Sequence, residues 1–141
     1  MMKTFRIPIL LLITLGLCFV NFSKVLAVPP LPSSFYGTVK SNGSNIPIGT
    51  QVSAWINGVQ YAISPYMVDG GDTVYNMSVP GDDLATPDVI EGGVPGDTVI
   101  FYVGSTQADQ TTTWQSGTNI NLDITAALPD FQQIYLPLLF R

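Results

Sequence analysis

The chain has 141 residues, of which 46% are hydrophobic and only 11% are charged, and its formal net charge is −5. It contains no histidine and one cysteine, which excludes catalytic triads with a histidine base and zinc sites with histidine ligands. The excess of acidic residues also argues against nucleic acid as a partner, because phosphate binding relies on clustered lysine and arginine.

Residues 1–27 have the pattern of a secretory signal peptide. Lys3 and Arg6 precede an apolar run over residues 7–20, and the segment ends on small or compact residues at Ala27. The run is shorter than the roughly 20 apolar residues of a membrane-spanning helix, although an uncleaved helical anchor is an alternative. We therefore expect a signal helix that is cleaved on export, and a mature protein that is secreted or lies at the cell surface.

Removal of this segment makes the chain more acidic. Ten acids then face only two bases, Lys40 and Arg141, which gives a formal net charge of −8. Anionic membrane surfaces are disfavoured for the same reason, so we expect membrane contact only through the signal segment before cleavage.

Cys18 is removed with the segment, which leaves no disulfide. Lipid attachment at Cys18 is an alternative, but the preceding Leu17 is bulky where such sequences usually carry a small residue.

Strand-like sequence follows a proline-rich leader over residues 28–34, which we expect to be extended. After a first strand at residues 35–40, the stretch "TQVSAWINGVQYAIS" at residues 50–64 predicts a hairpin around an Asn57-Gly58 turn. In the simplest register, three residues of the first strand face three of the second on the core side. The predicted pairs are Ile56 with Val59, Ala54 with Tyr61, and Val52 with Ile63.

Four further strand patterns follow. Residues 73–79 alternate with Tyr75, Met77 and Val79 on one face, and residues 97–103 are apolar on both faces, as in a central strand. Residues 110–114 are rich in threonine, and residues 119–125 alternate with Ile120, Leu122 and Ile124 inward and Asn119, Asn121 and Asp123 outward. Seven short strands without helical periodicity predict an all-β sandwich or barrel over residues 35–126. Of these two, we expect a single seven-strand antiparallel Greek-key β-sandwich.

Residues 127–141 form a tether followed by the apolar stretch "IYLPLLFR" at residues 134–141. Eight residues cannot span a bilayer as a helix. The stretch is either a last edge strand, to which Pro137 would limit it, or a terminal recognition signal for sorting or surface attachment.

The stretch "PGDDLATPDVIEGGVPGD" at residues 80–97 carries five acids and no base. Secreted acidic loops often bind calcium, which takes six to eight oxygen ligands. The sequence offers Asp82, Asp83, Asp88 and Glu91 as candidate ligands, although their spacing does not match an EF-hand. The alternative is a solvated loop between two strands. Calcium is therefore the one cofactor that the sequence suggests, as a hypothesis.

Trp55 and Trp114 raise the possibility of sugar binding, because aromatic faces stack on pyranose rings without any need for charge. Trp55 lies opposite the core face of the predicted hairpin, so it could be exposed. The alternative for both tryptophans is packing in the core or under a loop.

The stretch "FYGTVKSNGSNIPIGTQVSAWING" resembles the opening of transthyretin-like domains, including the carboxypeptidase regulatory-like group. The matching positions are Gly37, Val39, Pro47, Ile48, Gly49, Val52 and Ala54. The stretch "GDTVIFYVGSTQADQTTTWQSGTNINLDIT" is similar to the closing half of such domains in bacterial and archaeal surface proteins. The resemblance implies a β-sandwich used as a spacer, adhesion or binding module.

Related surface domains also imply a possible isopeptide bond, here between Lys40 and Asn119 or Asn121, although the alternation turns both asparagines outward. We expect no catalytic residues. We expect a non-catalytic structural, adhesive or interaction module of the cell surface, whose partner is a surface protein or glycan. The alternative is a module that binds a carbohydrate or another small ligand. If the acidic loop binds calcium, the ion would stabilise this module.

Overall fold

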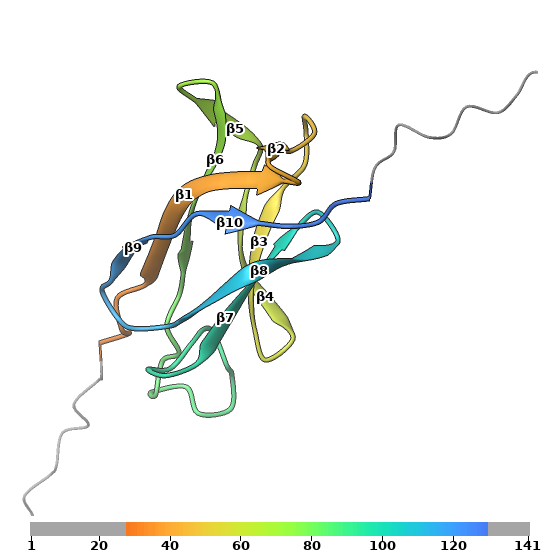
Figure 1. The fold of residues 1–141 in the computed structure, drawn as a ribbon. Coiled ribbons are helices and arrows are strands. Elements are labelled where there is room, and N and C mark those ends of the chain that lie inside the picture. The colour runs from red at the N-terminus through yellow and green to blue at the C-terminus, as the bar shows by residue number, and fades with distance from the viewer. Residues whose placement is uncertain (1–27, 130–141) are drawn as a thin grey trace, which may run out of the picture.

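The computed structural model describes residues 28–129, and the predicted signal segment and the apolar tail lie outside this range. Every regular element in the range is a β-strand, and the strands form two sheets that pack face to face (Figure 1). Among the residues described, the structure holds no helix with the length and apolarity that a membrane crossing requires. The predicted all-β sandwich is confirmed.

The first sheet has the order β10-β1-β6-β5, with β2 and β9 also paired to β1. Its strands are β1 (Ser33–Ser41), β2 (Ser44–Asn45), β5 (Met67–Asp69), β6 (Asp72–Val79), β9 (Asn119–Asn121) and β10 (Ile124–Thr125). The second sheet has the order β4-β3-β7-β8. Its strands are β3 (Val52–Ile56), β4 (Val59–Ser64), β7 (Thr98–Val103) and β8 (Thr106–Thr113).

The described range contains ten strand elements rather than the seven that the sequence predicted. Part of the difference is that the predicted last strand is divided into β9 and β10. Both pieces pair with β1 in parallel, with Phe35 beside Ile120 and Val39 beside Ile124. The other strand pairs are antiparallel. The chain therefore enters the sandwich at the N-terminal end of β1 and leaves it, after β10, beside the C-terminal end of β1.

The core lies between the two sheets and is built around an aromatic cluster. The ring of Phe101 lies 5.5 Å from that of Phe35 in an edge-on arrangement and 6.0 Å from that of Tyr75. Tyr75, Met77 and Val79 are all buried, as the alternation in β6 predicted. β7 occupies a central position between β3 and β8, as predicted. The expectation that both of its faces are covered is wrong for the outer face, where Ile100 and Tyr102 are only half-buried.

The β3–β4 hairpin departs from the predicted register. Its turn has positive φ at Asn57 (50°) and Gly58 (81°), as predicted. A bulge between Ala54 and Trp55 then shifts the pairing by one residue, so that Ala54 faces Ala62 instead of Tyr61. The inward prediction holds for β3 but is wrong for two residues of β4. The bulge turns Ile63 outward, so that it is 49% exposed, and Val59 is 51% exposed beside the turn although it keeps its predicted partner Ile56.

Candidate functional sites

The acidic loop at residues 80–97 connects β6 to β7 at the lower end of the sandwich in Figure 1. Its carboxylates accept hydrogen bonds from the loop itself. Asp82 Oδ1 accepts from the main-chain N–H of Glu91 (3.0 Å), and Glu91 Oε1 accepts from the hydroxyl of Thr86 (2.7 Å). Asp83 Oδ1 accepts from the N–H of Ala85 (2.9 Å). The acids thus act as turn and loop acceptors.

The four predicted calcium ligands are only partly brought together. Asp82, Asp83 and Glu91 are linked at the base of the loop through main-chain N–H groups: the N–H of Glu91 donates to Asp82 Oδ1, and the N–H of Asp83 lies 3.4 Å from Glu91 Oε2, whereas Asp88 is exposed. Within residues 28–129, no three acidic or cysteine side chains are grouped as a metal site. The calcium hypothesis stays a prediction. Calorimetry at millimolar calcium tests it: the absence of both a binding heat and a rise in melting temperature would contradict it.

Trp114 is fully buried, and its Nε1 donates a 3.1 Å hydrogen bond to the main-chain carbonyl of Val79. The acidic loop packs over this ring. A Cβ atom at Gly81 or Gly93 would lie 2.8 Å or 2.7 Å from ring atoms of Trp114, which explains two of the glycines in the loop. The hypothesis that Trp114 binds a sugar is therefore corrected, because a fully buried indole has no face open to a ligand.

Trp55 lies on the outer face of the second sheet and is half-buried. Its ring makes an edge contact with that of Tyr102, at a centroid distance of 5.6 Å. Its Nε1 donates a 2.8 Å hydrogen bond to the hydroxyl of Ser53. Tyr102 was not identified as a candidate from the sequence. Its outward position in a strand that is apolar on both faces could have indicated an aromatic surface residue beside Trp55.

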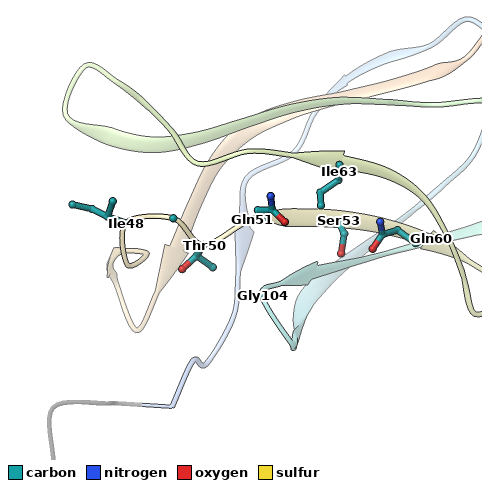
Figure 2. Close-up of a pocket in the computed structure, with 8 residues that line it drawn as sticks. Ile48, Thr50, Gln51, Ser53, Gln60, Ile63 and Gly104 are labelled. Atoms are coloured by element: carbon teal, nitrogen blue, oxygen red, sulfur yellow. The ribbon is translucent and has the colours of Figure 1, made fainter.

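A groove of about 570 Å³ lies on the second sheet, at the end where the chain enters β3 (Figure 2). Gln60 is the β4 partner of Trp55, and Ser53 is its hydrogen-bond partner, so the groove and the Trp55–Tyr102 pair are neighbours. No charged residue lines it. The lining residues are Ile48, Gly49, Thr50, Gln51, Ser53, Gln60, Ile63 and Gly104. We call this the neutral groove.

A second surface is apolar and lies beside the acidic loop. Leu84, which is 77% exposed, and Val94 of the loop line one pocket of about 390 Å³ together with Val28 of the leader. Val89 and Ile90 of the same loop are also exposed, by 57% and 72%. We call the five residues Val28, Leu84, Val89, Ile90 and Val94 the apolar end.

Lys40 does not meet either asparagine of β9. Its Nζ donates to Oδ1 of Asn45 (2.7 Å) and lies 2.5 Å from Oδ1 of Asp72. Asn45 Oδ1 also accepts from the main-chain N–H of Thr73 (3.0 Å). Lys40 therefore ties β1, β2 and β6 together, and the suggested isopeptide bond to Asn119 or Asn121 is corrected.

Comparison with known proteins gives no family for this chain, because no family model, curated protein or solved structure matches it.

Proposed function

We propose that the protein is an exported, non-catalytic β-sandwich module that makes a structural or adhesive contact with another protein at the cell surface. The sequence supports export through its signal-like first 27 residues. We also propose that the domain is related to the transthyretin-like domains of surface proteins, as the sequence resemblance suggests. That relationship implies a Greek-key connection of the strands.

The observation that carries the proposal is the apolar end. Leu84 and Ile90 are more than two-thirds exposed, although the loop that bears them is held in place by hydrogen bonds. Gly93 N–H donates to the carbonyl of Pro80, and Asp82 N–H donates to the carbonyl of Gly93, both at 3.0 Å. Several exposed apolar side chains on one hydrogen-bonded loop are typical of a protein-binding site. We infer that the partner is a surface protein that covers this loop.

Substitution at the apolar end tests the proposal. Leu84→Ser and Ile90→Ser together should release the protein from the cell-envelope fraction into the medium, because they remove the surface that a partner would cover. Val68→Ser is the matched control, since Val68 is a 54% exposed apolar residue of β5, outside the acidic loop. Equal retention of all variants by quantitative blotting would contradict the proposal, provided that their melting temperatures are alike.

The neutral groove favours a second function, carbohydrate binding. Its amide and hydroxyl groups (Gln51, Gln60, Ser53 and Thr50) suit the hydroxyls of a sugar, and the half-buried Trp55 beside it offers an aromatic surface. Glycan-array screening tests this function. Binding that is lost in both Trp55→Ala and Gln60→Ala but kept in the apolar-end variant would assign the ligand to the neutral groove, and a parent protein that binds no glycan would dismiss it.

A further inference from the structure

The first sheet carries a groove of its own on its outer face, on the opposite side of the sandwich from the neutral groove. Its volume is also about 570 Å³. Residues of β1 form the floor of the groove. Residues of β5, β6 and β9, together with Asp123 after β9, form its sides. The lining residues are Tyr36, Gly37, Thr38, Met67, Asp69, Val74, Tyr75, Asn76, Asn119, Asn121 and Asp123. We call this the acidic groove.

An aromatic ring lies at the centre of the acidic groove, between two carboxamides. Tyr36 pairs with Asn76 of β6 on one side and with Asn121 of β9 on the other. All three side chains are on the outer face, and Tyr36 is 39% exposed. Asn119, one alternation before Asn121, is exposed as well. The register thus builds a row of side-chain oxygens around an accessible ring.

Two carboxylates give this groove a negative charge. Asp123 Oδ1 accepts a 2.7 Å hydrogen bond from the main-chain N–H of Thr38, which lowers the pKa of Asp123 and keeps its side chain ionised. Asp69 adds a second carboxylate, and both are exposed. No lysine or arginine lines the groove. Between residues 28 and 129 the one base is Lys40, which is paired with Asp72.

We propose that the acidic groove binds the guanidinium group of an arginine side chain on a partner protein, stacked on the ring of Tyr36 and hydrogen-bonded to Asp69 or Asp123. A cation over an aromatic face is attracted by the ring quadrupole. A guanidinium is planar and presents several N–H donors in a fixed fork, which suits carboxylate and carboxamide oxygens better than the compact ammonium of lysine does.

The two grooves differ in charge, and this difference separates their ligands. The neutral groove offers amides and hydroxyls without a carboxylate, whereas the acidic groove adds two carboxylates to its carboxamides. A cation gains little from the first groove and is attracted by the second. The inference is therefore independent of the proposed function, because it concerns neither the apolar end nor the neutral groove.

A titration followed by two-dimensional ¹H–¹⁵N NMR tests the inference, because it detects weak binding and locates it. The probe is N-acetyl-arginine N-methylamide, and the control is its citrulline counterpart, which keeps the shape but lacks the charge. We expect arginine to shift the amide signals of Tyr36, Asn76 and Asn121, and the shifts to shrink in 0.5 M salt. Equal shifts with citrulline, or shifts outside this groove, would overturn the inference.

Three variants and a matched control refine the test. Asp69→Asn should weaken arginine binding about 2- to 5-fold, which is the range for an exposed ion pair. Tyr36→Phe should keep the affinity and Tyr36→Ala should lower it about 2- to 5-fold, because the ring and not the hydroxyl supplies the cation–π contact. Asp88→Asn is the matched control, since it removes one exposed charge from the acidic loop instead. An equal loss in Asp88→Asn and Asp69→Asn would mean attraction by net charge alone and would overturn the site.

Discussion

The phenolic hydroxyl of Tyr75 donates a 2.6 Å hydrogen bond to the main-chain carbonyl of Leu122, across 47 residues of sequence. Leu122 lies where the strand pattern is interrupted between β9 and β10, so its carbonyl has left the regular ladder and accepts from a side chain instead. Replacement of Tyr75 by Phe leaves this carbonyl without its partner. We expect Tyr75→Phe to lower the free energy of unfolding by about 1 kcal/mol, as measured by urea denaturation at neutral pH.

The same residue predicts a loss of stability at alkaline pH. Burial, and to a smaller extent the charge of Asp123, raises the pKa of Tyr75 above its ordinary value of 10.0. A group whose pKa is raised by folding stabilises the native state fully below its unfolded pKa, and this contribution is lost as the pH rises through the folded value. Denaturation series at neutral pH and at pH 11 should therefore show a smaller pH-dependent loss in Tyr75→Phe than in the parent. Equal losses would contradict the assignment.

Gly37 should not tolerate a side chain. A Cβ atom at this position would lie 2.5 Å from the carbonyl oxygen of Leu122, which is main chain and cannot rotate away. Gly37→Ala should therefore cost about 3 kcal/mol through overpacking. Gly58→Ala is the control: its Cβ meets nothing within 4 Å, and only the positive φ of 81° opposes it, at a cost of about 1 kcal/mol. Thermal melting of both variants would show whether contact or conformation dominates.

The two tryptophans should differ sharply in their contribution to stability. Trp114 is fully buried and hydrogen-bonded to Val79, so Trp114→Ala should cost about 3 to 5 kcal/mol or prevent folding. Trp55 is half-buried on an outer face, and Trp55→Ala should cost about 1 kcal/mol. Urea denaturation followed by far-ultraviolet circular dichroism measures both, with Trp114→Phe as a milder variant should Trp114→Ala fail to fold. Similar losses in the two alanine variants would contradict this division.

Thr73 offers a stabilising substitution. Its side-chain hydroxyl is fully buried and has no hydrogen-bond partner, whereas its main-chain N–H donates to Asn45. Valine has nearly the same shape without the polar atom, so Thr73→Val should raise the free energy of unfolding by about 1 kcal/mol. Thr73→Ser is the useful comparison, because it keeps the hydroxyl and removes a methyl group, and calorimetric melting should rank it below the parent.

The strand positions and inward faces were largely predictable, because alternation over six or more residues reports burial directly. This held for Tyr75, Met77 and Val79 in β6. The register of β4 was not predictable. A bulge adds one unpaired residue without any sequence signal in this hairpin, and one residue is enough to exchange the faces of a strand. Ile63 is therefore exposed, although its apolar character suggested the core.

The candidate sites were less predictable than the strands. Alternation in the predicted hairpin correctly placed Trp55 on the outer face. Residue type did not separate Trp55 from Trp114 as a sugar-binding candidate, since tryptophan serves a core and a surface equally well. The acidic loop drew attention through its charge, whereas the acidic groove did not. Its members, Tyr36, Asn76, Asn121 and Asp123, are far apart in sequence and meet only through strand pairing.

The sequence by itself determined that the domain is built of short strands joined by turns, because local alternation and turn residues act over short distances in the chain. Only the tertiary structure decided which strands are neighbours. The parallel pairing of β9 and β10 with β1 brings Asn121 beside Tyr36 and the carbonyl of Leu122 to the hydroxyl of Tyr75. Such pairings depend on how the two apolar faces bury each other, which is a property of the whole chain, and the grooves that they create follow from it.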